Sequence, residues 1–255
     1  MLWFSCIHDG NPEYNEMYLC ALQSALKHTS LAPYLIYDGS NTAFVATVTK
    51  MGATVIHHTF SLANTPYFKR QPADWQKIAR GTYLRLDIPQ ICQEIDFYDT
   101  YALYTDVDIL FLNDPEPALE ECKPKFFSGC PEMDPDNWSY FNAGVLLLNI
   151  EAMYLTYSQF MQKVRNTLDV PGFDQAALNR FYVNKIERLP VSLNYKPYWS
   201  PTEDICILHF HGPKPNDIKA YLTSGKCNPY YLNLFSRVPK KVWSTYLGYY
   251  ISYAK

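Results

Sequence analysis

The chain has 255 residues, of which 48% are hydrophobic and 18% are charged, so it holds enough apolar material for one large folded domain. Its 25 acidic and 22 basic side chains give a formal net charge of −3, which argues against non-specific nucleic-acid binding. No run reaches the roughly 18 consecutive apolar residues of a membrane-spanning helix. The first ten residues are a short apolar run with no basic residue ahead of it, which favours a β-strand over a signal peptide.

Apolar runs and helical patterns alternate along the chain. In chain order, strands are predicted over residues 2–7, 34–37, 53–57, 101–104, 125–130, 141–149 and 205–210. Helices are predicted over 18–26, 42–50, 75–86, 154–164 and 173–181, and the proline-containing stretch 61–74 is predicted to be a loop. The alternation is typical of an α/β fold with a mostly parallel sheet and helices on its faces.

The C-terminal part differs in composition from the rest. Residues 219–255 carry five Lys and one Arg but no Asp or Glu, together with nine aromatic side chains. Two interpretations stay open: a helix packed on the body with its lysines in solvent, or a surface segment at a membrane interface. We expect a main domain over 1–215 and a basic, aromatic segment over 216–255 packed on it.

The cysteines give no sign of a disulfide framework. They stand at positions 6, 20, 92, 122, 130, 206 and 227, an odd number of scattered residues without a C-x-x-C pair. This spacing also argues against a zinc site. We therefore expect reduced thiols and a cytoplasmic location.

Asp106 and Asp108 follow the strand predicted over 101–104, and strand ends are where α/β sheets place their ligands. Side chains two residues apart on an extended chain point to the same side, with Cα atoms roughly 6.6 Å apart. Two such carboxylates repel each other unless a cation lies between them, and their oxygens suit Mg²⁺ or Mn²⁺. The alternative is a pair of solvated turn aspartates, but the apolar residues on both sides favour a metal site.

A second polar cluster ends the strand predicted over 205–210. His209 and His211 share one face of an extended chain, and either imidazole is a candidate ligand. Gly212 lets the backbone approach a ligand, and Lys214 is placed to meet a phosphate. If His209 joins the two aspartates, the metal has three protein ligands.

Two further signals are weaker. Asn142 stands with the small residues Ala143 and Gly144 at the start of an apolar strand, where a polar ligand can approach the backbone. Asp174 and Gln175 open a predicted helix. For Asp174 the alternative to substrate binding is a favourable charge at a helix N-terminus.

Five blocks, in this order and spacing, resemble the retaining glycosyltransferases of family 8, the group of glycogenin, galactinol synthase and bacterial lipopolysaccharide galactosyl- and glucosyltransferases. The blocks are TYLRL at 82–86, LYTDVDIL at 103–110, FNAGVLLLN at 141–149, DQ at 174–175 and HFHGPKP at 209–215. The resemblance covers about residues 1–215. The order and spacing of all five blocks make it more specific than any one motif.

The resemblance implies a GT-A fold, in which one nucleotide-binding α/β sheet carries an acceptor half, and a UDP-hexose as donor. It also implies roles for individual residues. The ligands of Mn²⁺ or Mg²⁺ would be Asp106, Asp108 and His209, and the catalytic residues would be Asn142, Asp174 and Gln175. Donor contacts would come from Cys6, Ile7, Asp9 and Tyr14 at the uridine, from Arg85 and Ala143 at the sugar, from Gly212 and Lys214 at the diphosphate, and also from Asp106, Val107 and Gly144.

The implied reaction moves galactose or glucose to a hydroxyl of a glycan, a glycolipid or a small molecule, with retention of configuration. An amide at Gln175 is a poor nucleophile, so the resemblance favours front-face transfer over a covalent glycosyl-enzyme. Two alternatives stay open: a sugar-nucleotide-binding protein with little turnover, and a nucleotidyltransferase, which needs the same metal but not the blocks at 141–149 and 174–175.

The chain departs from the family pattern in three places. Lys214 follows Gly212 by one residue fewer than usual, and Asn216 stands where the family has Trp. The uridine loop carries an insertion near residues 12–13. The reach of the lysine to a phosphate and the choice between His209 and His211 as metal ligand therefore stay open.

Overall fold

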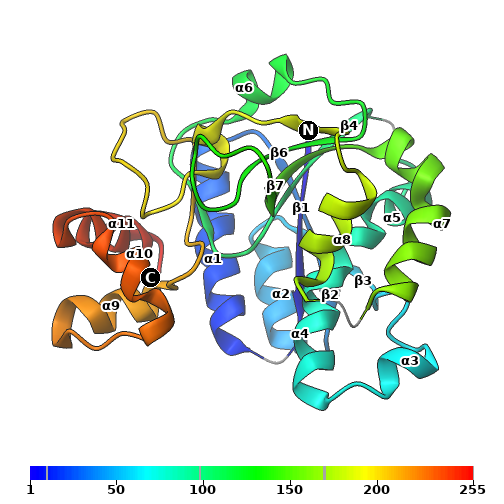
Figure 1. The fold of residues 1–255 in the computed structure, drawn as a ribbon, viewed down its shortest axis with the longest axis horizontal. Helices are drawn as coiled ribbons and strands as arrows, with labels where there is room; N and C mark the ends of the chain where they lie inside the picture. The colour runs from blue at the N-terminus through cyan, green and yellow to red at the C-terminus, as the bar shows by residue number, and fades with distance from the viewer. Residues whose placement is uncertain (10, 98, 169–170, 255) are drawn as a thin grey trace.

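Figure 1 shows the computed structural model of the chain, which describes residues 1–9, 11–97, 99–168 and 171–254. Residues 10 and 255, which end the first apolar run and the C-terminal segment, lie outside this part. Within it, seven strands form one sheet in the order β3-β2-β1-β4-β7-β6-β8, and β5 pairs with β9. The strands are β1 (Leu2–His8), β2 (Ala32–Asp38), β3 (Thr54–His57), β4 (Tyr101–Thr105), β5 (Ile109–Phe111), β6 (Phe127–Pro131), β7 (Phe141–Asn149), β8 (Ile186–Arg188) and β9 (Ile207–His209).

Helices follow most of the strands. They are α1 (Pro12–His28), α2 (Thr42–Lys50), α3 (Pro66–Lys69), α4 (Ala73–Tyr83), α5 (Ile88–Glu94), α6 (Glu116–Glu121), α7 (Ile150–Asn166), α8 (Phe173–Phe181), α9 (Pro215–Ser224), α10 (Leu232–Ser236) and α11 (Lys240–Tyr253). Strands β1 to β4 are parallel, and β7 enters antiparallel between β4 and β6. The predicted α/β fold with a mostly parallel sheet is confirmed.

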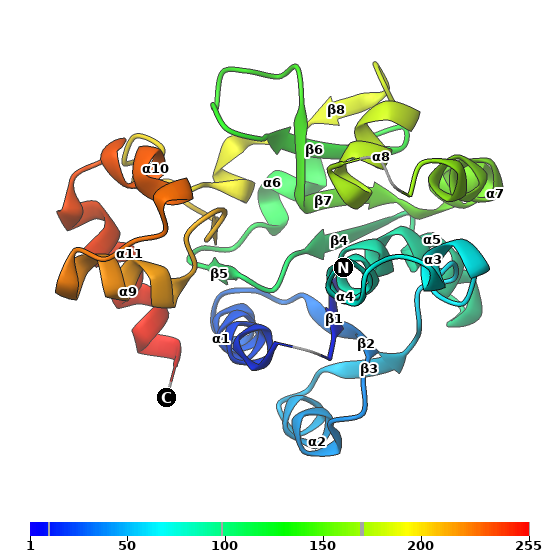
Figure 2. The same cartoon turned by 60° about the horizontal axis from the view of Figure 1, so that its bottom comes forward.

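Strand β1 shows how the sequence builds a three-layer core. Phe4 and Cys6 point to the face covered by α4, α5, α7 and α8, whereas Trp3 and Ile7 point to the face covered by α1 and α2. This alternation is the two-residue period of a strand buried on both faces. Figure 2 shows the helices on the two sides of the sheet. The carboxyl ends of β1 and β4 therefore lie at one edge between two helical layers.

The C-terminal helices α9, α10 and α11 share a separate apolar cluster with the small sheet. Phe235 and Trp243 pack there together with Leu110 of β5 and Leu208 of β9. Figure 1 shows these helices grouped beside α1. No helix in the described part of the chain is long and apolar enough to cross a bilayer. All seven cysteines lie in the described part, and each is a free thiol.

The structure differs from the predicted elements in two neighbouring stretches, 61–74 and 75–86. The predicted loop 61–74 contains α3, which Thr65 caps and Pro66 starts, because proline fits the first position of a helix. The predicted helix 75–86 is α4 followed by a 3₁₀ turn over Leu84–Asp87.

Asp87, at the end of that 3₁₀ turn, joins three segments and so fixes the turn that carries Arg85. Its buried carboxylate accepts hydrogen bonds from Nε2 of His58 at 2.8 Å, from the backbone N–H and hydroxyl of Ser61, and from the hydroxyl of Tyr157 on α7 at 2.7 Å. A buried carboxylate satisfied in this way is costly to disturb.

The hydrogen bond to Asp87 raises the pKa of His58. Protonated His58 therefore stabilises the fold fully below about pH 6.5, the ordinary value, and this contribution is lost as the pH rises through the folded-state pKa. We expect the loss of unfolding free energy in His58→Gln to be larger at pH 6 than at pH 9, as measured by urea denaturation. The matched control is His57→Gln, at the exposed end of β3; a pH-independent loss in His58→Gln would contradict the assignment.

Candidate active site

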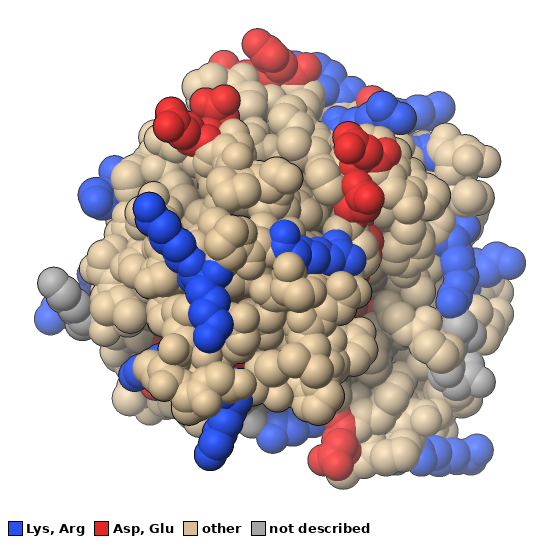
Figure 3. Space-filling view, turned by 60° about the vertical axis from the view of Figure 1, so that its left-hand side comes forward, with Lys and Arg blue, Asp and Glu red and all other residues tan. Residues whose placement is uncertain are grey.

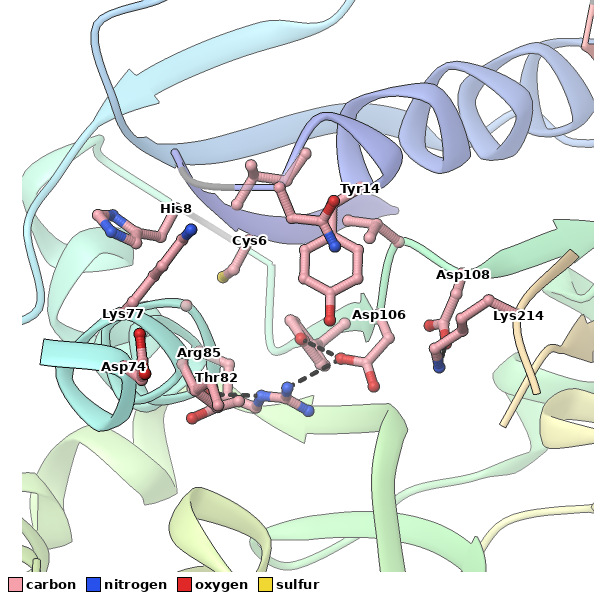
Figure 4. Close-up of a pocket in the computed structure, with 16 residues that line it drawn as sticks. Cys6, His8, Tyr14, Asp74, Lys77, Thr82, Arg85, Asp106, Asp108 and Lys214 are labelled. Atoms are coloured by element: carbon pink, nitrogen blue, oxygen red, sulfur yellow. Dashed lines mark hydrogen bonds and ion pairs between the residues drawn. The ribbon is translucent and has the colours of Figure 1, made fainter. Parts of the chain in front are cut away.

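A cavity of about 570 Å³ lies at the carboxyl ends of β1 and β4, between α4 and the start of α1. Figure 4 shows its two ends: His8 and Lys77 at one, Asp108 and Lys214 at the other. Of the donor contacts expected from the sequence, those that line the cavity are Cys6, Ile7, Tyr14, Arg85, Asp106, Val107 and Lys214. Strand ends of an α/β sheet form the crevice in which ligands bind, so this cavity is the candidate active site.

Asp106, Asp108 and His209 meet at one end of the cavity. Each offers a ligand atom, and these atoms lie within 4.8 Å of one another. Nε2 of His209 is 3.4 Å from Oδ1 of Asp108 and 3.9 Å from Oδ2 of Asp106. Two carboxylates and an imidazole are a donor set that suits Mn²⁺ and also Mg²⁺, so the residues fit the metal that the family resemblance implies.

The small sheet brings these residues together across a hundred positions of sequence. β4 ends at Thr105, and the chain then leaves the main sheet so that β5 can pair with β9. In that pairing Ile109 stands opposite His209, and the N–H of Phe210 donates to the carbonyl of Asp108 at 2.8 Å. The strand predicted over 101–104 is thus β4, and the Asp-Val-Asp turn separates it from the second strand β5.

His211 points away from the cluster. Its Nδ1 is 2.6 Å from the hydroxyl of Tyr198, and its Nε2 is 3.1 Å from Oε1 of Glu132. Both ring nitrogens thus have partners outside the metal cluster. The geometry favours His209 over His211 as the ligand.

Lys214 lies where β9 leads into α9. Its ammonium contacts the carboxylate of Asp108 and donates to the carbonyl of Phe210 at 3.1 Å. Burial lowers the pKa of Lys214, but the contacts with Asp108 and the nearby Tyr14 and Asp106 together raise the pKa above its ordinary value, so the lysine stays charged beside the cavity. Gly212, two residues earlier, has φ of +84°, and a Cβ there would lie 2.6 Å from Leu234. This glycine allows the turn that aims Lys214 at the cavity.

Arg85 is the central cation of the site. Its guanidinium pairs with Asp106 at 2.9 Å and with Asp174 at 3.0 Å, and it donates to the carbonyl of Ala143 at 2.7 Å. It also lies 4.7 Å from the ring centroid of Tyr104, whose hydroxyl donates to Asp106 at 2.7 Å. Burial raises the pKa of Asp174 to about 6, against the opposing charge of Arg85. These contacts hold Asp106 in place before any ligand binds.

Gly144 makes room for His209. A Cβ at this position would overlap Cε1 of the imidazole and lie 2.8 Å from its Nδ1. The small residue, expected from the sequence to admit a ligand, thus lies directly against the metal-ligand candidate.

Asp9 lies at the end of β1 but is not among the residues that line the cavity. Its carboxylate accepts from the backbone N–H of Ser40 at 2.5 Å and from the hydroxyl of Tyr37. Contact of Asp9 with uridine stays a prediction. The amide of Asn142 donates to Oε1 of Gln175 at 3.2 Å and to Oε2 of Glu132 at 2.7 Å.

Sequence reasoning missed several residues of the site. Tyr104, His8 and Lys77 line the cavity, and Asn194 contacts His209 from a 3₁₀ turn. Tyr104 stands inside the recognised 103–110 block, so its place beside Asp106 could have been found from the two-residue period of a strand. Asn194 gives no comparable signal, because only the tertiary fold brings it to His209.

The clash at Gly144 gives a direct test of the metal-ligand assignment. Gly144→Ala should push His209 away, weaken Mn²⁺ binding about tenfold or more, and cost about 1–3 kcal/mol of stability through overpacking. Mn²⁺ titration followed by electron paramagnetic resonance measures the affinity. The control is Gly248→Ala in α11, where a Cβ meets nothing within 4 Å; it should keep the affinity and stabilise the helix by about 0.5–1 kcal/mol. Unchanged affinity in Gly144→Ala would contradict the role of His209.

The chain is similar to known proteins in sequence and in structure. The model of a family described as "Glycosyl transferase family 8" matches residues 6–215. A search of curated proteins finds no match. Among solved structures, the galactosyltransferase LgtC in complex with donor and acceptor sugar analogs is 18% identical, with a TM-score of 0.66 over 97% of this chain and 95% of that one.

Two further structures are similar. The apo form of the glycosyltransferase GlyE from Streptococcus pneumoniae TIGR4 is 18% identical, with a TM-score of 0.64 over 98% of this chain and 63% of that one. Mouse xyloside xylosyltransferase 1 is 14% identical, with a TM-score of 0.61 over 84% of this chain and 98% of that one. These likenesses support the GT-A fold, and the family match, which spans most of the chain, shows that it belongs to glycosyltransferase family 8.

Proposed function

We propose that the chain transfers a hexosyl group from a UDP-hexose to a hydroxyl acceptor, with retention of configuration and with Mn²⁺ or Mg²⁺ bound at Asp106, Asp108 and His209. The observation that carries the proposal is the position of this cluster. It lies at one end of a cavity of about 570 Å³, beside Lys214 and Arg85. A nucleotide sugar needs a metal and cations at its diphosphate and a crevice for the rest. The cavity has candidate ligands for the metal, two cationic side chains and room for the nucleotide, which supports the proposal.

The residues divide the donor among them. A divalent cation, when bound, would supply charge stabilisation of the leaving diphosphate. Lys214, with Gly212 as its hinge, would bind diphosphate oxygens. The uridine would be enclosed by Cys6, Ile7, His8 and Tyr14, which line the cavity. Asp9 holds the end of β1 through its hydrogen bonds to Tyr37 and Ser40.

The sugar would lie toward Arg85, Ala143, Asp174 and Gln175. Oε1 of Gln175 already accepts from the N–H of Ala143 at 2.8 Å, and Asp174 is paired with Arg85. Neither side chain is arranged as a free nucleophile, which supports front-face transfer. In that step the bond from the sugar C1 to the diphosphate breaks, the acceptor oxygen bonds on the same face, and the acceptor proton passes to the leaving diphosphate.

The acceptor class is a glycan, a glycolipid or a small molecule with a free hydroxyl. LgtC was solved with donor and acceptor sugar analogs, which favours a sugar acceptor here. A binding protein without turnover and a nucleotidyltransferase are the competing functions, and the products of the reaction separate them. A cytoplasmic location stays a prediction.

Ligand-dependent melting tests the donor site. UDP and a UDP-hexose should raise the melting temperature only with Mn²⁺ present, because the metal would hold the diphosphate. A ligand at 100 times its Kd stabilises the native state by about 2.7 kcal/mol. Asp108→Asn should abolish the shift, whereas Glu120→Gln, an exposed neutralisation on α6, should keep it. Release of UDP should then depend on an acceptor, and the glycosidic bond formed should keep the anomeric configuration of the donor. Absence of any shift in melting temperature with uridine nucleotides would contradict the proposal. Transfer of a nucleoside monophosphate group would favour the nucleotidyltransferase.

We also propose peripheral contact of the segment 219–255 with anionic membranes. Its lysines Lys226, Lys240 and Lys241 are exposed, as are the apolar residues Tyr230 and Leu232 at 83% and 56%. Figure 3 looks onto this side of the molecule and shows Lys and Arg side chains spread over a largely uncharged surface. Such a surface is attracted to anionic lipid by about 1 kcal/mol for each basic residue near it.

Charge reversal tests this contact better than deletion, because deletion would remove Trp243 from a buried cluster. The triple change of Lys226, Lys240 and Lys241 to Glu should lower binding to phosphatidylserine vesicles by more than tenfold in sedimentation assays. The matched control reverses the exposed Lys50, Lys69 and Lys163 and changes net charge equally. Equal loss in both triple variants would point to net charge, and no loss in the first would exclude the contact.

A further inference from the structure

Three amide side chains connect the metal-ligand candidate to the sugar side of the site. Nδ1 of His209 is 2.8 Å from Oδ1 of Asn194, whose Nδ2 donates to Oδ1 of Asn142 at 2.9 Å. Nδ2 of Asn142 in turn lies 3.2 Å from Oε1 of Gln175. His209, Asn142 and Asn194 are buried, and Asn194 is fully enclosed. In such a chain the direction of each hydrogen bond depends on the next one.

Two backbone groups of β7 fix that direction. The N–H of Gly144 donates to Oδ1 of Asn142 at 3.0 Å, and the N–H of Ala143 donates to Oε1 of Gln175 at 2.8 Å. A backbone N–H can only donate, so both side-chain atoms must be oxygens. Neither amide can be turned over without placing an NH₂ group against an N–H.

The orientation then passes to His209. Oδ1 of Asn142 needs a donor from Asn194, so the amide nitrogen of Asn194 faces it and the amide oxygen faces the imidazole. That oxygen can only accept, so Nδ1 of a neutral His209 must carry the proton. The unprotonated Nε2 then faces Asp106 and Asp108, which lie 3.9 and 3.4 Å away.

We propose that Asn194 is a positioning residue that holds His209 in its Nδ1–H tautomer, with Nε2 free to bind the metal. The consequence for metal binding rests on the proposed function, but the tautomer does not. Partners that hold the other nitrogen of a metal-binding histidine are worth 10- to 100-fold in metal affinity. Asn142, Ala143 and Gly144 thereby orient His209 on the metal side of the site through Asn194. They orient Gln175 on the sugar side through the N–H of Ala143.

The tautomer is directly measurable in the metal-free protein. We expect long-range ¹H–¹⁵N spectra of protein labelled in its histidine rings, recorded where the ring is neutral, to show a protonated Nδ1 and an unprotonated Nε2 for His209. The signal is assigned by its loss in His209→Gln. An Nε2–H tautomer in the wild-type protein would overturn the proposal without any variant of Asn194.

Variants then test the cause. Asn194→Leu, which removes the acceptor, should lose the fixed tautomer and weaken Mn²⁺ binding by 10- to 100-fold. Asn194→Asp loses the hydrogen bond to Oδ1 of Asn142 but keeps an acceptor oxygen toward the imidazole, so it should keep the Nδ1–H tautomer. Asn179→Leu is the matched control, because Asn179 also bonds to β7, at the N–H and carbonyl of Phe141, without contacting His209; it should leave the tautomer unchanged.

The outcomes separate the two proposals. A folded Asn194→Leu that keeps both the Nδ1–H tautomer and the Mn²⁺ affinity would overturn the positioning role. The role would also be overturned if Asn194→Asp lost the tautomer as completely as Asn194→Leu does. If Asn194→Leu does not fold, the wild-type spectrum and Asn194→Asp still decide. A wild-type protein with the Nδ1–H tautomer that binds neither Mn²⁺ nor Mg²⁺ would refute the proposed function while leaving the role of Asn194 in place.

Discussion

The antiparallel pairing of β5 with β9 is the constraint on which the site depends. Had the chain continued straight from β4 in the main sheet, Asp106 and Asp108 would lie on a buried strand. Instead it turns out after Thr105 to reach β9, and this turn places both carboxylates beside His209. The helices α9 to α11 pack on the small sheet through Trp243 and its neighbours. Burial of apolar surface by these helices therefore helps to hold the geometry of the candidate metal cluster.

A second constraint is the direction of backbone N–H groups in β7. Side-chain amides and neutral imidazoles can bind in two orientations, and in a buried chain the choice must be consistent throughout. Ala143 and Gly144 make that choice, because strand pairing fixes where their N–H groups point. The absence of a Cβ at Gly144 lets the imidazole come close enough for the chain to close. At Gly144 a steric and a hydrogen-bonding requirement thus act on the same residue.

The sequence predicted what depends on local pattern. The strand runs, the Asp-x-Asp turn and the two candidate imidazoles stand out by residue type and spacing, and the family blocks indicated His209 as the metal ligand. What it could not predict depends on contacts between distant segments. Arg85 bonds to Asp106 and Asp174 from a turn whose place is set by Asp87, and Asn194 carries no motif. Asp9 lies where a nucleotide ligand was expected, but the neighbouring strand brings Tyr37 to its carboxylate. The loop prediction for 61–74, which contains two prolines, was wrong in part because proline both breaks helices and starts them.

Charge balance favours the proposed combination of Lys214 and a metal ion in one site. Asp106, Asp108 and Asp174 bring three negative charges, and Arg85 and Lys214 bring two positive ones, all in a largely buried setting. Lys214 neutralises Asp108 in the ligand-free protein, which lowers the cost of a buried carboxylate. In the proposed function Asp106, Asp108 and His209 would hold a divalent cation, which would replace Lys214 as the partner of this carboxylate, and the resulting excess of positive charge would favour a diphosphate. Because one ammonium cannot pair fully with two anions, exchange of Lys214 from Asp108 to the diphosphate would couple metal binding to donor binding.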